Sequence, residues 1–491
     1  MTRRRAALGL RVLVVACGLL VLMAACGLLA LVVACGSRPA TRPNLILVTI
    51  ESLRPDHVGC YGGRSRTRPE VALTPALDAL AAEGRRYTDA HAVTSWTLTS
   101  HASLFTGLYP ATHVTVAPRD KLGDDFVTVA EALRAAGYQT AGVISGPYLR
   151  RPYGLDQGFD VWVDDIASLR TSAAHDDVTN PRVEAALGAF LDEDRDPERP
   201  FFLFAYLWDP HYDYLPPPPY DTMFVSPECE PIDLTGYGTN PIFTAGISDA
   251  QLAHVLSQYA GEIRATDDML GRLFAKVRAA GLWDDTAIVV TADHGEEFFE
   301  HGKVGHKNTV YDESVHVPLI VKFPGGDPAG VDERLVSLVD LYPTLLDLAG
   351  VAPPAPHHGR SLLAAPQPER AIFHELLALR YLMNDEQEIE TSGAQWRSIR
   401  QGSWKLVWEQ DLRDESRHAI QLFDVARDPG EQRSLSEQET ARVQALAEAM
   451  VARLERFERE ATGYEPGGRV TLDDTEVQRL RALGYLVEEA P

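Results

Sequence analysis

Metal-binding residue types follow two apolar runs of the sequence. The run Leu45–Thr49 (LILVT) leads into Glu51, and the run Ala287–Thr291 leads into Asp293 and His294. If both runs are strands of an open α/β sheet, these side chains lie at the strand ends, where such sheets bind ligands. Asp and His side chains bind divalent metals. The pattern favours a metal site, and a solvated glutamate at a strand end is the alternative for Glu51.

A stretch rich in small hydroxyl side chains, Ser95–Pro110 (SWTLTSHASLFTGLYP), is typical of an exposed turn that leads into a helix. The first turn of a helix favours anions, because free backbone N–H groups and the helix dipole point at them. A threonine hydroxyl there can be a nucleophile if a metal or a base lowers its pKa. The alternative is that Thr97, Thr99 or Ser100 only caps the helix. Taken alone, the stretch favours the cap.

Two further segments supply cations and hydrogen-bond donors. His211 lies in Asp209–Tyr212 (DPHY), after an apolar run, and Lys307 lies in a Gly-His-Lys sequence downstream of Asp293. Lys307 and His211 could hold the negative oxygens of an oxyanion in a transition state. A single His or Lys is more often a surface residue, so these two assignments depend on the others.

The elements that must position these residues alternate between short apolar runs and helical patterns, which predicts an α/β fold with a large, mainly parallel sheet flanked by helices. Gly137 and Gly281 mark the ends of two predicted helices. The predicted strands and helices are Leu45–Thr49, Thr140–Ile144, Phe201–Tyr206, Ala287–Thr291 and Leu319–Lys322, and Thr128–Ala136 and Ser248–Ala280.

The pattern changes after about Arg370. Short antiparallel strands are expected at Trp396–Arg400, Trp404–Trp408 and Gln421–Asp424, followed by a helix over Glu439–Glu460. We therefore expect a catalytic domain over residues 41–370 and a smaller α+β subdomain with an antiparallel sheet over residues 371–491. The last predicted turn, from Leu480, is expected to dock back onto the body. The segments Pro216–Tyr220 and Cys229–Gly246 are rich in proline or turn residues and are expected to form a surface loop near a site.

Residues 1–40 are expected to be a signal or anchor segment. Arg3, Arg4, Arg5 and Arg11 precede an uncharged stretch, Val12–Ala34, that is long enough to cross a bilayer. Positive charge before such a stretch predicts that the rest of the chain is exported. Cys35 lies in a sequence that resembles a bacterial lipoprotein cleavage box, and an uncleaved signal anchor is the alternative. Either reading tethers the protein to the membrane, on its periplasmic or extracellular face.

The net charge limits the possible binding partners of the protein, and the cysteine content limits its possible disulfides. The net charge of -24 argues against a nucleic-acid partner, because such binding depends on Lys and Arg. Outside the N-terminal segment, Cys60 and Cys229 are the two cysteines. An exported protein could pair them, and two separate thiols are the equal alternative.

Taken together and in this order, these stretches resemble the sulfatase family of the alkaline phosphatase superfamily. The likeness runs from Arg42 to the C-terminus and includes Tyr311–Ile320 (YDESVHVPLI), Val339–Gly350 (VDLYPTLLDLAG) and Leu422–Glu431 (LFDVARDPGE). It implies an alkaline phosphatase-like fold, a single-metal site between strand ends, a covalent intermediate on a residue at a helix N-terminus, and a C-terminal antiparallel sheet.

The sequence departs from the family at the site. Sulfatases have Cys or Ser, oxidised to formylglycine, in a C/S-x-P-S-R motif, where this chain has Thr97, with Thr99 for the proline and His101 for the arginine. A secondary alcohol cannot give that aldehyde. Glu51 stands where sulfatases usually have Asp, and Ser145-Gly-Pro-Tyr replaces a lysine-containing stretch. The set of Glu, Thr, Asp and His resembles lipoteichoic acid synthases and phosphoethanolamine transferases, which use a phosphothreonine intermediate.

The resemblance implies a mechanism. One divalent ion, calcium or manganese, is held by Glu51, Asp293 and His294 and activates the hydroxyl of Thr97, which attacks sulfur or phosphorus. Lys307 and His211 stabilise the developing charge, with help from His101, and either histidine could protonate the leaving oxygen. The expected function is hydrolysis of sulfate or phosphate esters of a small molecule, glycan or lipid. The alternatives are a phospho-group transferase and a non-catalytic binding protein.

Overall fold

A computed structural model describes residues 42–166, 178–234, 246–326, 329–377, 394–411, 414 and 416–471. The described residues from Pro43 onward group into one compact unit. The predicted membrane segment Val12–Ala34, Cys35 and the C-terminal turn from Leu480 lie outside the described residues, and so does part of the expected surface loop. Within the described ranges, none of the helices is long and apolar enough to span a bilayer.

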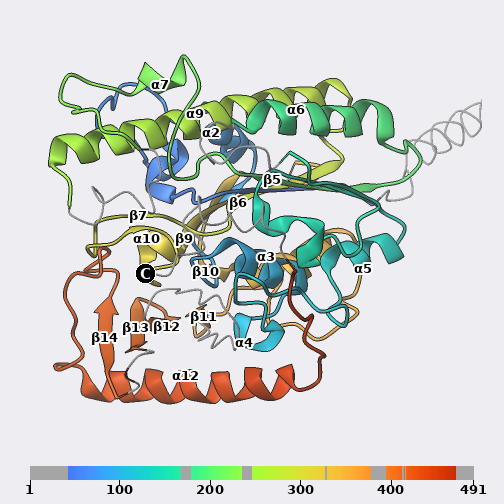
Figure 1. The fold of residues 1–491 in the computed structure, drawn as a ribbon. Helices are drawn as coiled ribbons and strands as arrows, with labels where there is room; N and C mark the ends of the chain where they lie inside the picture. The colour runs from blue at the N-terminus through green and yellow to red at the C-terminus, as the bar shows by residue number, and fades with distance from the viewer. Residues whose placement is uncertain are drawn as a thin grey trace, which may run out of the picture. The chain divides into compact units, whose positions relative to one another are not determined.

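The centre of this unit is an eight-stranded sheet with the order β10-β2-β9-β6-β1-β5-β3-β4 (Figure 1). Strand β9 is antiparallel to both of its neighbours, and every other adjacent pair is parallel. The predicted mainly parallel α/β sheet is therefore confirmed. The strands are β1 (Asn44–Ile50), β2 (Arg85–His91), β3 (Gln139–Ile144), β4 (Val161–Val163), β5 (Phe201–Leu207), β6 (Thr286–Ala292), β9 (His316–Lys322) and β10 (Gly330–Ser337).

All five predicted strands of this sheet are present, and none of them is an edge strand. Strands β5 and β6 are buried along their whole length, which is why both read as continuous apolar runs. Strands β2, β4 and β10 were not predicted from the sequence. Strand β2 (RRYTDAH) is only half buried and contains mostly polar residues, so it has no apolar run to reveal it.

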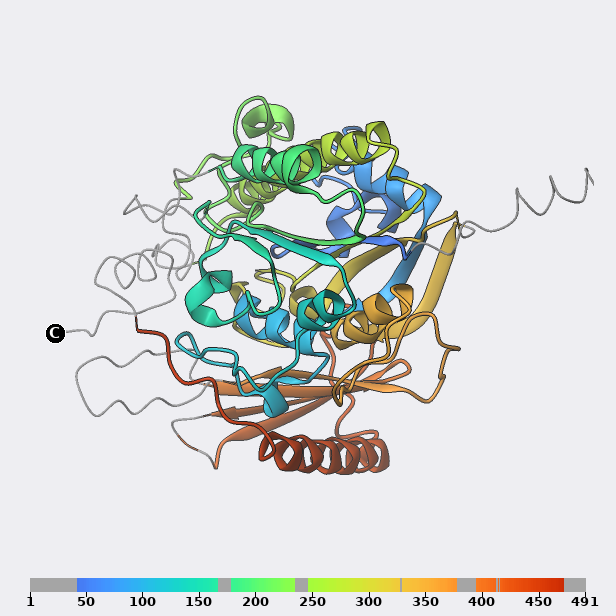
Figure 2. The same cartoon turned by 90° about the vertical axis from the view of Figure 1, so that its right-hand side faces the viewer.

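Helices cover both faces of the sheet (Figures 1 and 2). One group packs around the long helix α9, and the other lies near α3. The predicted helix Ser248–Ala280 is confirmed as α9, which begins at a capping box between Ser248 and Gln251. The helices of the two groups are α2 (Pro75–Glu83), α6 (Asn180–Ala189), α7 (Tyr220–Met223) and α9 (Asp249–Ala279), and α3 (Thr97–Thr106), α4 (Pro110–His113), α5 (Val129–Ala135) and α11 (Leu341–Leu348).

A second, four-stranded sheet follows in the chain and is antiparallel throughout. Helix α12 (Thr440–Ala461) packs on it through the buried side chains of Leu446, Met450 and Phe457. This confirms the predicted C-terminal antiparallel sheet, while the domain boundary at residue 370 stays a prediction. The strands are β11 (Ala371–Leu376), β12 (Ala394–Gln401), β13 (Trp404–Asp411) and β14 (His418–Asp424). Cys60 and Cys229 are both free thiols.

Candidate active site

The site lies where β1 and β6 end. These strands pair in parallel register, with Ile50 opposite Ala292, so the next residues, Glu51 and Asp293, leave the sheet side by side. Both side chains are fully buried. Register between two strands thus places the two carboxylates together, as expected for residues at the carboxyl ends of parallel strands.

Each oxygen of Glu51 has a defined neighbour. Its Oε1 lies 3.1 Å from Nε2 of His294 and accepts a hydrogen bond from the Ser52 hydroxyl at 2.9 Å. Its Oε2 accepts hydrogen bonds from the hydroxyl of Thr97 at 3.2 Å and from the phenol of Tyr206. The glutamate therefore joins the metal-binding residue types to the proposed nucleophile.

One carboxylate oxygen of Asp293 accepts hydrogen bonds and the other does not. Its Oδ1 accepts hydrogen bonds from the backbone N–H groups of Ser52 and His294, at 3.2 and 3.0 Å. Its Oδ2 is buried and has no hydrogen-bond partner among the described residues. Gly295 follows, and any side chain there would lie 2.1 Å from the carbonyl oxygen of Glu313. The glycine is therefore required by this close backbone approach.

The charges of the site fit a bound cation. Ligand atoms of Glu51, Asp293 and His294 all lie within 4.8 Å of one another. Burial alone would lower the pKa of His294, but Asp293 and Glu51 raise it to about 10. Burial and the charge of Glu51 raise the pKa of Asp293. Because a proton is held this strongly between two buried carboxylates, the group has a negative potential that a divalent ion would satisfy.

Glu51 also belongs to a second group. Ligand atoms of Glu51, His211 and His306 lie within 4.8 Å of one another as well. The Nδ1 of His306 lies 3.2 Å from Oε1 of Glu296. The two groups meet at Glu51, so His211 and His306 border the position that a metal ion would take between Glu51, Asp293 and His294.

The hydroxyl of Thr97 points into the site. Thr97 is the first residue of α3, every residue of which is buried. Its Oγ1 lies 3.3 Å from Nε2 of His294, in addition to its bond to Glu51. Helix capping, which the sequence alone favoured, is wrong here. The N-cap is Trp96 without a side-chain bond, and Thr99 and Ser100 donate to the carbonyl oxygens of Thr115 and Asp293.

His101 is engaged inside the fold. Its Nδ1 lies 2.8 Å from the carbonyl oxygen of Thr97, which can only accept, so Nδ1 has the proton. Its Nε2 then accepts from the hydroxyl of Thr49 on β1, at 2.9 Å. The ring packs edge-on against Tyr206. Nε2 therefore fastens α3 to β1, and Nδ1 binds the first residue of α3, which favours positioning of Thr97 over contact with a substrate.

His211 and Lys307 lie near the site on separate loops. The ring of His211 stacks on Trp208, and its Nδ1 lies 2.8 Å from the carbonyl oxygen of Tyr212. Burial lowers the pKa of His211 to about 3, so the neutral ring presents Nε2 as an acceptor. The Nζ of Lys307 lies 4.9 Å from the ring centre of Trp96, which precedes Thr97. Burial lowers the pKa of Lys307 to about 7.

Four residues of the site were not proposed from the sequence: Ser52, Tyr206, Glu296 and His306. Tyr206 lies opposite Thr49 in the pairing of β1 with β5, and that pairing cannot be read from a single sequence. His306 precedes Lys307 and could have been included on its residue type. Ser52 and Lys307 have positive φ angles of 53° and 65°, a strained conformation that often occurs at functional sites.

Comparison with known families agrees with this arrangement. The sulfatase family model matches residues 43–351, which is more than half of the chain. The chain belongs to the sulfatase family. The model for the C-terminal region of N-sulphoglucosamine sulphohydrolase matches residues 299–460, which include the second sheet and α12. The chain is accordingly an ester hydrolase of the sulfatase family, within the alkaline phosphatase superfamily.

Individual sulfatase-family relatives are distant. The chain is 27% identical to the multifunctional alkaline phosphatase superfamily protein PehA of Trinickia caryophylli, over 66% of this chain and 77% of that protein. It is 24% identical to the N-acetylglucosamine-6-O-sulfatase of Bacteroides thetaiotaomicron, over 80% and 82%. The phosphonate monoester hydrolase of Agrobacterium radiobacter has the same fold, with a TM-score of 0.66 at 23% identity over 85% and 96% of the two chains.

Proposed function

We propose that this protein hydrolyses sulfate or phosphate esters through a covalent intermediate on Thr97. The observation that supports this most is the position of the Thr97 hydroxyl, 3.2 Å from Glu51 and 3.3 Å from His294 at the N-terminus of a buried helix. Glu51, Asp293 and His294 would hold one divalent ion, calcium or manganese. When bound, that ion would supply positive charge next to the reacting oxygens.

The residues of the chain then account for each proton. In the first step, Oγ1 of Thr97 bonds to sulfur or phosphorus and the bond to the leaving oxygen breaks. The hydroxyl proton passes to Oε2 of Glu51, which already accepts its hydrogen bond. The leaving oxygen takes a proton from the ammonium group of Lys307, whose pKa of about 7 suits an acid at neutral pH.

In the second step, water attacks the adduct. The attacking water loses a proton to solvent while its O–H group donates a hydrogen bond to the neutral ring of His211, and Glu51 returns a proton to Thr97 as the bond to sulfur or phosphorus breaks. Lys307 regains its proton through solvent. His101 contacts neither ester nor water in this scheme, and it holds Thr97 in place through the bond to its carbonyl.

The substrate class follows from the family. Among the relatives, one is named as an N-acetylglucosamine-6-O-sulfatase and one as an ulvan-active sulfatase. We infer a sulfated or phosphorylated small molecule, glycan or lipid as substrate. Export and membrane attachment remain part of the proposal and rest on Val12–Ala34 and Cys35. Replacement of Cys35 by Ala would release a lipoprotein from the membrane fraction but leave a signal anchor in place.

The test is a substrate panel with the purified full chain. Aryl sulfate, phosphate monoester and phosphate diester substrates are compared in calcium and in manganese, with Thr97→Ala as the control. We expect turnover of at least one class that Thr97→Ala abolishes, and a mass increase of one sulfo or phospho group on the Thr97 peptide after acid quench. Turnover that survives in Thr97→Ala would refute the threonine intermediate. Turnover only with an added acceptor alcohol would favour the transferase.

A further inference from the structure

A second cluster of metal-ligand residues lies outside the catalytic group. Glu297 opens the short strand β7 (Glu297–Phe298), His301 lies between β7 and β8 (Val304–Gly305), and Glu313 belongs to the short helix α10 (Asp312–Val315). One ligand atom from each of the three lies within 4.8 Å of the others. We propose that Glu297, His301 and Glu313 form a second divalent-metal site, suited to zinc or manganese.

Glu297 has an unused oxygen in a buried position. The residue is 0% exposed, its Oε2 accepts a hydrogen bond from the hydroxyl of Thr309 at 3.2 Å, and its Oε1 has no hydrogen-bond partner among the described residues. Leaving a buried carboxylate oxygen unpaired is costly. Burial and the charge of Glu313 raise the pKa of Glu297 to about 7. A cation between the two glutamates would relieve both penalties.

His301 is oriented as a metal ligand. Its Nε2 lies 3.2 Å from the carbonyl oxygen of Glu431, which can only accept, so the proton belongs on Nε2. Its Nδ1 donates a second proton to the carboxylate of Glu313, and loss of that proton would leave a lone pair on Nδ1 for a metal ion. The ring stacks on Tyr311, with centres 3.7 Å apart and planes at 12°. A metal-binding histidine usually donates its other N–H to a carbonyl or carboxylate in this way.

The ligand chemistry selects the type of ion. Two carboxylates and one neutral imidazole would balance the charge of a divalent ion, and this mixture of oxygen and nitrogen suits zinc and manganese. In the structure, the imidazole of His301 contacts the carboxylate of Glu313, so a proton between them occupies the place that a metal ion would take. Binding of the metal would release that proton.

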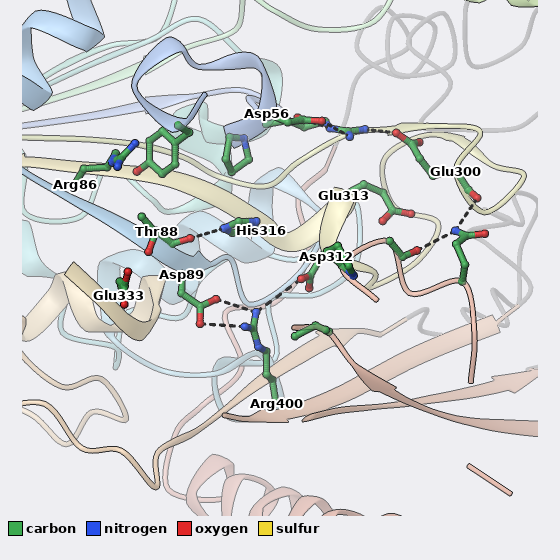
Figure 3. A pocket seen from close by; sticks show the side chains of 17 residues that line it. Asp56, Arg86, Thr88, Asp89, Glu300, Asp312, Glu313, His316, Glu333 and Arg400 are labelled. Atoms are coloured by element: carbon green, nitrogen blue, oxygen red, sulfur yellow. Dashed lines mark hydrogen bonds and ion pairs between the residues drawn. The ribbon is translucent and has the colours of Figure 1, made fainter. Parts of the chain in front are cut away.

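An ion could reach the cluster from a neighbouring pocket. Glu313 lines a cavity of about 850 Å³, together with Glu300, Asp312 and Gln432 (Figure 3). The neighbouring acid Glu300 is engaged elsewhere, because it accepts a hydrogen bond from Arg54 at 2.6 Å. Glu300 therefore serves as a matched control that lies one residue from His301.

The site would stabilise a loop next to the catalytic group. It connects β7 to α10 directly, and His301 connects both to the loop that contains Glu431. The hairpin formed by β7 and β8 ends at Gly305, immediately before His306 and Lys307. A metal ion there would therefore have a structural role and hold the segment that leads into Lys307.

Metal content of the full chain tests the proposal. The chelator-treated protein is reloaded with Zn²⁺, desalted and analysed for metal per chain. We expect two equivalents of zinc per chain in the wild type and in Glu300→Gln. The single variants Glu297→Gln, His301→Gln and Asp293→Asn should each hold one equivalent. The Asp293→Asn/Glu297→Gln double variant should hold none. Zn²⁺ should also raise the Tm of the Asp293→Asn chain by about 2–4 °C and should not raise that of the double variant.

Two results would overturn the second site: wild-type zinc content in both Glu297→Gln and His301→Gln, or an Asp293→Asn chain that holds no zinc and shows no change in Tm. A different result is expected if the catalytic group does not bind metal. Asp293→Asn would then hold as much zinc as the wild type, while Glu297→Gln would still hold one equivalent less. If Glu297→Gln does not fold, as judged by circular dichroism, His301→Gln and the Tm of the Asp293→Asn chain still decide the question.

Discussion

The hydroxyl oxygen of Thr97 lies 3.2 Å from Oε2 of Glu51, although the two residues are 46 positions apart in the chain. One residue begins a helix and the other follows a strand, and both side chains are fully buried. The same hydroxyl lies 3.3 Å from His294, which follows a second strand. The N-terminus of α3 therefore meets two strand ends at one oxygen atom, which is why we propose the hydroxyl of Thr97 as the nucleophile.

Replacement of Thr97 separates the hydroxyl from the rest of the side chain. Thr97→Val keeps the shape and removes the hydroxyl, and it should reduce kcat/KM by about 10⁴-fold or more. Thr97→Ser keeps the hydroxyl and should retain activity within about a hundredfold. Steady-state kinetics on the best substrate of the panel give both values. Equal losses in the two variants would argue against Thr97 as the nucleophile.

Lys307 should set a pH dependence. Burial lowers its pKa to about 7, so the ammonium form dominates below that pH and is lost above it. The kcat/KM profile should therefore fall as pH rises through about 7. Lys307→Arg keeps its charge over this range but cannot give up a proton, so it should remove the fall near pH 7 at a lower kcat/KM, while Lys307→Met should lower kcat/KM by about 10²–10³-fold. A Lys307→Arg profile that coincides with the wild type would assign the fall to another group.

His101 should act through the position of Thr97. Because its ring bonds to Thr97 and Thr49 inside the fold, His101→Ala should lower kcat by roughly a hundredfold and change KM by less than about threefold. His101→Asn retains an N–H near the position of Nδ1 and should recover part of kcat. An increase in KM as large as the loss in kcat would indicate direct contact with the substrate.

Lys405 should stabilise the contact between the second sheet and the body. Its ammonium group is fully buried and lies 2.7 Å from Asp312 and 2.8 Å from Glu431. Lys405→Met leaves the fully buried Glu431 without its cation and Asp312 with only Arg400, 3.7 Å away, so the free energy of unfolding should fall by about 3–5 kcal/mol in urea titrations. Lys303→Met, at an exposed lysine, should change it by less than about 0.5 kcal/mol. A loss below about 1 kcal/mol for Lys405→Met would show that the acids find other partners.

Much of the fold could be predicted because its central elements are marked locally. Strands β1, β5 and β6 are buried on both faces, so their sequences are apolar runs. Helix α9 begins at a capping box and is followed by a glycine, and both are local sequence signals. Strand β2 could not be predicted in this way, because its partners β9 and β10 come much later in the chain and its own residues are mostly polar.

The sequence by itself determined the metal-binding residue types at two strand ends, the threonine at the head of a helix, and the family to which they belong. Only the tertiary structure decided that the hydroxyl of Thr97 bonds to Glu51 and caps nothing, that His101 is occupied between α3 and β1, and that ligand atoms of Glu297, His301 and Glu313 lie within 4.8 Å of one another. The reason is physical. Residue type and local periodicity are properties of the sequence itself. Hydrogen-bond partners depend on strand register and on packing between segments that are distant in sequence.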